Sequence, residues 1–321
     1  MKIALIGLGD IAIKAHLPVL SQLPNVEWVF CTRNPERLQQ LAKQYHVTET
    51  YTDYRDLAKA GIDAVMIHSA TSSHPTLAAF FLNLGLPVFV DKPLADSYEQ
   101  CERLYELAES KQAPLFMGFN RRYIPLYKQH LSGVTVDSNL GGQVPAEQQP
   151  SGPLLSLRWE KHRHDLPGGV RTFIFDDFIH PLDSINVNAN IEPEDLYITC
   201  QSTPAGAQLQ LGRLDVQWQQ NGALFHASMN RQHGATLETV SANYRNASYR
   251  FDSFTEGSRW QNNIEERLKL ADWTPMLAAK GFHAMAEHWL AVVSSGKQAL
   301  FFTQRNLHTH LLAEHLVSQV K

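Results

Sequence analysis

The sequence predicts an α/β fold whose first 121 residues alternate strands with helices, and three observations support this prediction. The chain opens on an apolar strand, Lys2 to Ile6, which runs directly into a glycine turn and a helix start. Further apolar runs of strand length recur up to residue 119, separated by helical stretches. Beyond residue 153, runs that alternate apolar and polar residues are typical of a sheet with one solvated face. A chain of 321 residues can bury two cores, so we expect domains at 1–121 and 122–321.

The first turn, GLGDIA at 7–12, has the spacing of a dinucleotide-binding motif. Gly7 allows the tight turn, Gly9 leaves room for a pyrophosphate, and Ala12 is small enough for close packing of helix against strand. The spacing alone is weak evidence, and a plain tight turn is the alternative. The strand before the turn and the helix after it favour the dinucleotide. Its phosphates would bind backbone N–H groups at the helix start, around Gly7, Leu8, Gly9, Asp10 and Ile11.

The second strand, predicted at Val26 to Cys31, ends where NAD-binding chains carry an acid for the ribose hydroxyl. Here Thr32 and Arg33 follow the strand, and Arg37 lies one helical turn further on. A guanidinium can pair with a 2′-phosphate, and no acid is present there to repel it. A surface arginine is the plain alternative. We therefore expect NADP as cofactor, ahead of NAD, with Asn34 and Pro35 starting the next helix.

The remaining elements of the first domain place polar residues after three strands. Strands are predicted at 64–68, 87–90 and 115–119. One helix is predicted at 75–84, and another is predicted to start at Asp96. Asp96 and Glu99 have the spacing of a capping box. Ligands of open α/β sheets bind at the carboxyl ends of strands. We expect cofactor contacts from the residues at these ends, namely Ser69, Ala70, Thr71, His74, Asp91, Lys92 and Asn120.

The second half of the chain reads as a sheet closed by two helices. A helix is predicted at 123–131, and a loop rich in Gly, Pro, Gln and Ser at 137–153. The final helices are expected at about 276–295 and 303–320. On the last helix, we expect the side chains of His308, His310 and His315 to be solvated or interfacial. The predicted strands are 154–161, 196–201, 208–218, 223–230, 237–242 and 248–251.

Composition excludes several classes of protein. The formal net charge of −4 provides no basic field for nucleic acid. Cys31, Cys101 and Cys200 form no paired framework, as expected of reduced thiols in the cytosol. The first strand begins at Lys2, which leaves no room for a signal peptide, and no apolar run reaches the length of about 18 residues that a membrane span requires. We expect a soluble cytoplasmic protein.

Four motifs together resemble the Gfo/Idh/MocA oxidoreductase family: GLGDIA, the serine-rich loop that ends in His74, DKP at 91–93 and GFNRRYIP at 118–125. The resemblance implies a Rossmann domain joined to an α/β domain with a large, mostly antiparallel open sheet. It covers nearly the whole chain and is weakest between 190 and 280. HSATSSH at 68–74, KHR at 161–163 and DDFIH at 176–180 are most similar to the MviM-type subgroup.

The resemblance also implies the catalytic residues. Lys92 would lie beside the reacting carbon and polarise the substrate oxygen, although DKP stands where the family usually has EKP. His180 would exchange the hydroxyl proton, with Asp176 beside it. Asp176, His180 and Asp183 have helical spacing, and Pro181 is expected to start or kink the helix. Taken alone, a histidine among apolar residues is more often a packed side chain. These carboxylates are not expected to hold a metal.

Two basic residues of the predicted strand at 154–161 and its end are candidates for the substrate pocket. Lys161 and Arg163 lie two apart and therefore on one face, with His162 on the other. A solvated strand face is the plain alternative. With Lys92, these two residues would bring three cations together, which Asp176, Asp177 and Asp183 could neutralise within the protein. If these carboxylates do not, we expect an anionic substrate such as a sugar acid or sugar phosphate.

The sequence thus predicts an NADP-preferring oxidoreductase that acts on a secondary alcohol of a sugar, polyol or related small molecule. The alternative is a nucleotide-binding sensor or interaction protein on the same fold that has lost turnover. An open sheet also leaves apolar surface uncovered, so we expect a homodimer or homotetramer that pairs through the C-terminal sheet. Val216 and Trp218 are the candidates for that surface.

Overall fold

The computed structural model describes residues 1–131, 134, 152–205 and 208–320. The predicted loop at 137–153 therefore lies almost wholly outside the described residues. The chain forms two compact units. The first contains 1–119 and 282–303, and the second contains 120–281 and 304–321. The segment 282–303, which the sequence analysis placed in the second domain, thus belongs to the first unit.

The first unit contains a six-stranded parallel sheet in the order β3-β2-β1-β4-β5-β6, and this confirms the predicted Rossmann architecture. β1 lies inside the sheet, and its apolar residues are buried because helices cover both faces. The short strand β3 escaped the sequence analysis because its residues, Glu49-Thr50-Tyr51, have no apolar run. The strands are β1 (Lys2–Ile6), β2 (Glu27–Cys31), β3 (Glu49–Tyr51), β4 (Ala64–Ile67), β5 (Val88–Val90) and β6 (Leu115–Met117).

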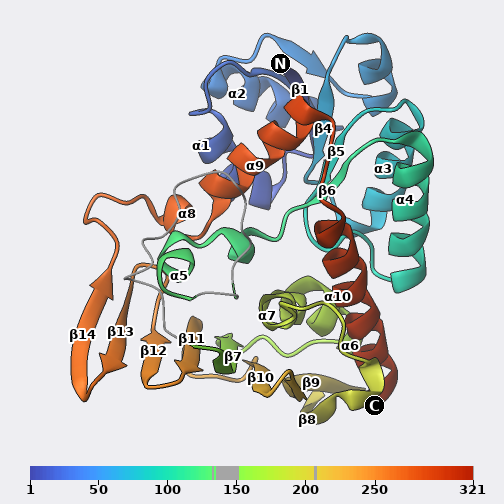
Figure 1. Cartoon of the computed structure of the whole chain (residues 1–321). Helices are drawn as coiled ribbons and strands as arrows, with labels where there is room; N and C mark the ends of the chain where they lie inside the picture. Colours follow the sequence, from blue (N-terminus) through green and yellow to red (C-terminus); the bar gives the residue numbers. More distant parts are fainter. Residues whose placement is uncertain (132–133, 135–151, 206–207, 321) are drawn as a thin grey trace. The chain divides into compact units, whose positions relative to one another are not determined.

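Helices flank this sheet on both faces (Figure 1). Figure 1 shows α3 (His74–Asn83) and α4 (Tyr98–Lys111) on one side, with α1 (Leu17–Leu20), α2 (Pro35–Tyr45) and α9 (Phe282–Ser295) on the other. A π-helical stretch, Ala12–His16, precedes α1. α9 joins this unit because buried Trp289 packs its ring against Phe89 and Phe116, with centroids 5.9 and 5.7 Å apart.

The helix starts confirm one capping prediction and correct another. Asn34 caps α2 as expected, because its side chain accepts the backbone N–H of Arg37 at 3.0 Å. The prediction that Asp96 starts the next helix is wrong. Ser97 has the extended backbone of an N-cap, and its hydroxyl accepts the N–H of Gln100. A serine one residue later satisfies the free N–H groups of α4 equally well, which sequence spacing could not decide.

The second unit contains an eight-stranded sheet in the order β14-β13-β12-β11-β7-β10-β9-β8. Among the pairs of these strands only β7 with β10 is parallel, so the sheet is mostly antiparallel as expected. β13 and β14 were missed because their polar residues give little apolar alternation. The strands are β7 (Leu154–His162), β8 (Tyr197–Ala205), β9 (Gln208–Gln220), β10 (Ala223–Asn230), β11 (Leu237–Tyr244), β12 (Ala247–Phe251), β13 (Glu256–Gln261) and β14 (Ile264–Lys269).

Helices lie against one face of this sheet (Figure 1). They are α5 (Pro125–His130), α6 (Val170–Thr172), α7 (Ile179–Ile185), α8 (Met276–Ala279) and, from residue 304 on, α10 (Leu300–Gln319). The single helix predicted over 276–295 is two helices. Gly281 separates them with φ +84°, and a Cβ there would meet the backbone oxygen of Asn120 at 2.3 Å. No helix among the described residues is long and apolar enough to cross a membrane.

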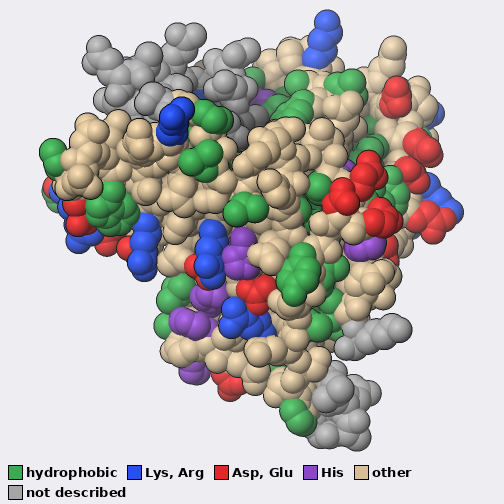
Figure 2. Space-filling view, turned by 60° about the horizontal axis from the view of Figure 1, so that its bottom comes forward, with side chains coloured by type: hydrophobic (Ala, Val, Ile, Leu, Met, Phe, Trp, Pro, Cys, Tyr) green, Lys and Arg blue, Asp and Glu red, His purple; other side chains and the backbone are tan. Residues whose placement is uncertain are grey.

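The open face of the second sheet is polar, which corrects the choice of Val216 and Trp218 as its surface. These two side chains are 0% and 4% exposed, because they point to the face that the helices cover. Alternation along β9 separates the two faces but does not reveal which one is covered. Figure 2, turned so that the open face comes forward, shows basic, acidic and histidine side chains gathered together. A hollow of about 430 Å³ on this face is lined by Arg158, Tyr197, Thr199, Cys200, Gln201, Arg213, Asp215, Gln217 and His226.

The histidines of α10 were expected to be solvated or interfacial, and that expectation is wrong for His310. His310 is fully buried, and its Nδ1 lies 2.8 Å from the carbonyl oxygen of Asn306. His308 is half-buried and contacts the side chain of Asn186 and the carbonyl oxygen of Ile191. His315 is partly exposed. The buried side of α10 mixes apolar residues such as Leu312 and Leu316 with polar ones, and several of the polar residues bond to the α7 region.

Candidate functional site

A cavity of about 770 Å³ lies at the carboxyl ends of the strands of the first unit, where the glycine turn was expected to bind a dinucleotide. Its walls come from the turn after β1, the ends of β2 and β3, and the loop after β4. Of the predicted cofactor residues, those that line it are Gly7, Leu8, Gly9, Thr32, Arg33, Arg37, Ser69 and Ala70.

The two glycines of the turn, Gly7 and Gly9, have different structural roles. Gly7 has φ +88°, and a Cβ there would lie 2.6 Å from the backbone nitrogen of Ser69. Glycine is therefore required at this point for the turn and for the close approach of the loop after β4. At Gly9, by contrast, a Cβ would meet nothing within 4 Å. That open space beside the start of the helix is where a pyrophosphate fits.

The predicted adenosine end of the cavity carries more charge than the sequence analysis recognised. Arg33 and Arg37 are exposed at its wall, as expected. Arg55, from the 3₁₀ helix Tyr54–Lys59 after β3, also lines it and lies 5.2 Å from the ring centroid of Tyr54. Asp53 caps this helix and pairs with Arg55 at 3.2 Å. β3 was not predicted, so these residues were missed.

The other predicted cofactor residues of the first unit lie outside the cavity wall: Asp10, Ile11, Thr71, His74, Asp91 and Lys92. His74 is buried and joins two loops, because its ring nitrogens lie 2.9 Å from the carbonyl oxygens of Pro93 and Ser69. Burial lowers its pKa. Asp91 accepts the backbone N–H of Lys92 at 2.8 Å, which fixes the start of the DKP turn. His74 and Asp91 thus position the loops that follow β4 and β5.

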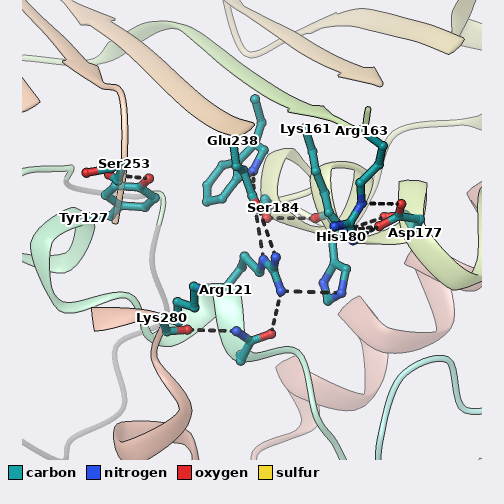
Figure 3. Close-up of polar contacts among 12 residues, drawn as sticks. Arg121, Tyr127, Lys161, Arg163, Asp177, His180, Ser184, Glu238, Ser253 and Lys280 are labelled. Carbon is teal, nitrogen blue, oxygen red and sulfur yellow. Dashed lines mark hydrogen bonds and ion pairs between the residues drawn. The ribbon is translucent and has the colours of Figure 1, made fainter. Parts of the chain in front are cut away.

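In the second unit, Arg121 lies between His180 and Glu238 (Figure 3). Its guanidinium binds both carboxylate oxygens of Glu238, at 3.3 and 2.9 Å, and its Nη1 lies 3.5 Å from Nε2 of His180. An arginine can only donate, so Nε2 faces it with its lone pair. Trp159 donates to Glu238 as well, at 2.8 Å. His180 is thereby oriented, as the acceptor of this contact, on a buried framework.

Asp177 is the centre of a second charged cluster. Arg163 binds both of its oxygens, at 2.9 and 3.0 Å, Arg231 binds one at 3.1 Å, and Lys161 forms an ion pair with it (Figure 3). Although burial alone would raise it, Lys161 and Arg163 hold the pKa of Asp177 well below its usual range. Burial lowers the pKa of Lys161 to about 7, against the opposing effect of Asp177.

The helix that carries these residues is locally widened. Phe173–Phe178 is π-helical, and the α-helix α7 begins at Ile179, so Pro181 lies inside it and does not start it. Pro181 has no N–H for the carbonyl of Asp177 four residues earlier. The ammonium of Lys161 lies 3.5 Å from that oxygen. Widened turns of this kind often occur at functional sites, and here one accompanies the histidine.

The other carboxylates of the predicted pattern fall in different surroundings. Asp183 is buried and binds Arg122 at 2.9 and 2.5 Å and the hydroxyl of Thr309 at 2.9 Å. It therefore anchors the helix to its neighbours. Asp176 is exposed, one residue before buried Asp177. Asn120, a predicted cofactor residue, belongs to the second unit and donates to the carbonyl oxygen of Lys280 at 2.8 Å.

Arg121, Glu238 and Arg231 were missed as members of this cluster. Arg121 stands in the quoted GFNRRYIP motif, so its position was visible and only its partner was not. Glu238 lies opposite Lys161 in the register of β11 and β7. A charged residue in an alternating strand looks solvated unless that pairing is known.

The comparisons with known proteins agree with this geometry. The family model for oxidoreductases with an NAD-binding Rossmann fold (GFO_IDH_MocA) matches residues 1–119. A Gfo/Idh/MocA family oxidoreductase from Vibrio cholerae has a crystal structure that is 56% identical, covers 100% of this chain and 98% of its own, and superposes with a TM-score of 0.91. This chain belongs to the Gfo/Idh/MocA family. The Rossmann unit of this family member therefore binds a nicotinamide dinucleotide, NAD or NADP.

Three further proteins are similar over all or part of the chain. The putative oxidoreductase YceM of Salmonella typhimurium is 28% identical over 315 residues, which is 94% of each chain. A dehydrogenase (MviM) structure from Clostridium difficile is 26% identical over 100% of this chain and 99% of its own, with a TM-score of 0.84. The myo-inositol dehydrogenase Hyg17 of Streptomyces leeuwenhoekii is 32% identical over 142 residues, 44% of this chain and 43% of its own.

Proposed function

We propose that this protein is an NADP-preferring dehydrogenase or reductase that acts on a secondary alcohol or its carbonyl in a sugar, polyol or related small molecule. The observation that carries the proposal is that each unit contains one of the two features that a dehydrogenase needs, a cofactor cavity and a histidine held by charged residues. The first has a dinucleotide cavity that fits the cofactor at Gly9, and the second has His180 held on Arg121 and Glu238. A catalytically silent sensor would need the first of these features and not the second.

The nicotinamide, when bound, supplies or accepts the hydride. Lys92 is proposed to polarise the substrate oxygen, because a cation stabilises the negative charge that develops there. His180 is proposed to take or return the hydroxyl proton, a role that suits an imidazole near neutral pH. Asp176, exposed beside this helix, is proposed to assist that exchange.

The ion pairs around Asp177 leave an excess of positive charge. An anionic substrate was expected if Lys161 and Arg163 were not neutralised within the protein. Three cations, Lys161, Arg163 and Arg231, share the single carboxylate of Asp177, and Asp183 is engaged by Arg122. The name of the partly matching myo-inositol dehydrogenase points to a polyol or a related compound. The whole-chain similarity to the MviM structure supports membership of the MviM-type subgroup, which specifies no substrate.

The experiment that tests the activity is a screen of sugar and polyol pools with the wild-type protein. Formation of reduced nicotinamide is followed by absorbance, with NADP and NAD in separate arms and heat-inactivated protein as the control. Turnover of at least one pool supports the enzyme. Tight binding of the dinucleotide without turnover of any pool, in either direction, would leave the sensor as the better description.

Cofactor preference is predicted to depend on Arg33. Replacing it with alanine should weaken NADPH binding by about 1.5–3 kcal/mol, the usual contribution of a hydrogen bond to a charged group, and leave NADH binding almost unchanged. Titration of both cofactors by fluorescence measures this. Arg103→Ala removes an exposed arginine of α4 that pairs with Glu99 and is the matched control. Tighter binding of NADH than of NADPH by the wild type would contradict the prediction.

We also propose that the protein self-associates through the open face of the second sheet. Tyr197 and Leu224 are large apolar side chains of this face, 63% and 58% exposed, and they stand beside the polar hollow. Leu224→Arg is expected to convert the oligomer to monomers, because two like charges would meet across a symmetric interface. Light scattering measures the mass, and Trp273→Arg, at a 96% exposed tryptophan outside this face, is the control. A monomeric wild type at micromolar concentration would refute the proposal.

A further inference from the structure

Two histidines and an aspartate converge in the first unit, outside the residues that the proposed function uses. His16 is the last residue of the π-helical stretch before α1, His68 directly follows β4, and Asp91 directly follows β5. Each of them offers a ligand atom within 4.8 Å of the others. Three segments that are distant in the sequence thus bring metal-binding side chains to the carboxyl edge of one sheet.

The three side chains are removed from solvent. His16 is 3% exposed, His68 2% and Asp91 8%. Nε2 of His16 lies 3.6 Å from Oδ2 of Asp91, and Nδ1 of His68 lies 4.0 Å from the same oxygen. These distances exceed those of good hydrogen bonds. The ring centroids of the two histidines are 3.9 Å apart.

Three ring nitrogens of these two histidines have no hydrogen-bond partner among the described residues. They are Nε2 of His16 and both nitrogens of His68. Nearby His74 shows the ordinary arrangement, since its two nitrogens lie 2.9 Å from carbonyl oxygens. Buried polar atoms are nearly always paired, so unpaired ones at a shared point call for an explanation.

We propose that His16, His68 and Asp91 form a binding site for a divalent first-row transition metal ion of the Zn²⁺ type. Imidazole nitrogen and carboxylate oxygen bind Zn²⁺ at about 2.0–2.2 Å. Two ligands of a tetrahedral ion are then roughly 3.4 Å apart, close to the separations found here. A water molecule would complete the coordination.

The ion would act on the loop that carries Lys92. Oδ1 of Asp91 accepts the backbone N–H of Lys92, while Oδ2 points to the histidines. A metal ion on Oδ2 would fix the carboxylate and thereby the start of the DKP turn. The widened helical stretch contributes as well, because the extra residue in its turn changes the direction of His16.

The test uses the full chain, stripped with a chelator and titrated with Zn²⁺ and with Co²⁺ as a spectroscopic probe. We expect one ion per chain and visible Co²⁺ absorption typical of four-coordination. His16→Ala and His68→Ala should each weaken binding by more than about 100-fold, beyond the loss typical of outer-shell changes. His46→Asn, at an exposed histidine that ends α2, should bind as the wild type does.

A second variant keeps the proposal testable if the alanine variants fold poorly. His68→Cys retains a ligand, so it should bind Co²⁺ and add a sulfur-to-cobalt charge-transfer band that the wild type lacks. None of these measurements requires turnover, so they stand apart from the proposed activity. Equal binding by the wild type and His16→Ala, no stoichiometric binding by the wild type, or a His68→Cys spectrum without the new band would overturn the proposal.

Discussion

Replacing His180 with alanine is expected to lower kcat about 10²–10⁴-fold on the substrate found by the screen, the usual contribution of a general acid or base. The cofactor cavity belongs to the first unit, so binding of NADPH should not change. The pH profile should also lose the limb that the histidine produces, an effect that a purely structural residue would not have. Stopped-flow and steady-state rates with a fluorescence titration of the cofactor measure these quantities.

A suitable control is His162→Gln. His162 lies on the opposite side of β7 from Lys161, where it accepts the backbone N–H of Asn230 and stacks on His233. We expect its kcat to stay within a few-fold of the wild type. If His180→Ala retained nearly full kcat and the same pH profile, His180 would be a packing residue and another group would have to move the proton.

Asp177→Asn is expected to lower the free energy of unfolding by about 3–5 kcal/mol, the usual result of removing one partner from buried ion pairs. The change keeps the size of the side chain but leaves Lys161, Arg163 and Arg231 facing one another without their shared carboxylate. Urea denaturation followed by tryptophan fluorescence measures the loss. Asp176→Asn, at the exposed neighbour, should shift stability by no more than about 0.5 kcal/mol.

Two further measurements distinguish charge from packing. Adding Lys161→Met to Asp177→Asn should recover part of the stability, because one buried cation is removed with its partner. The pKa of Asp177 is lower in the folded chain than its ordinary 3.8, so its stabilisation is complete above that pH and declines as pH falls below it. Asp177→Asn should therefore unfold with a weaker acid dependence. A double variant less stable than Asp177→Asn would disprove the charge argument.

The Rossmann half was predictable because its evidence is local. The strand, the turn and the cap at Asn34 each depend on residues within a few positions of one another. Gly7 shows the limit of this reading. Its need to be glycine comes partly from Ser69, which is distant in sequence and adjacent only in the folded sheet.

The charged framework could not be predicted, because long-range pairing creates it. Arg121 binds Glu238, which is more than a hundred residues away in the sequence, and the residues around either one give no indication of its partner. The same holds for the metal candidate, in which His16, His68 and Asp91 come from three separate segments. The faces of β9 show the complementary difficulty. Alternation there was correct, but the covered face depends on helices that come from elsewhere in the chain.

The return of α9 to the first unit makes the nucleotide-binding core discontinuous in the order of synthesis. Phe89 and Phe116 leave the ribosome early, whereas Trp289, which covers them, follows only after the whole second sheet. Until then an apolar surface stays open on the nascent Rossmann unit, where chaperones or neighbouring chains can reach it. The core of the first unit can therefore close only late in synthesis. Residues 120–281 of the second unit must be synthesised before the first unit can finish folding, and the second unit is completed only afterwards, by residues from 304 on.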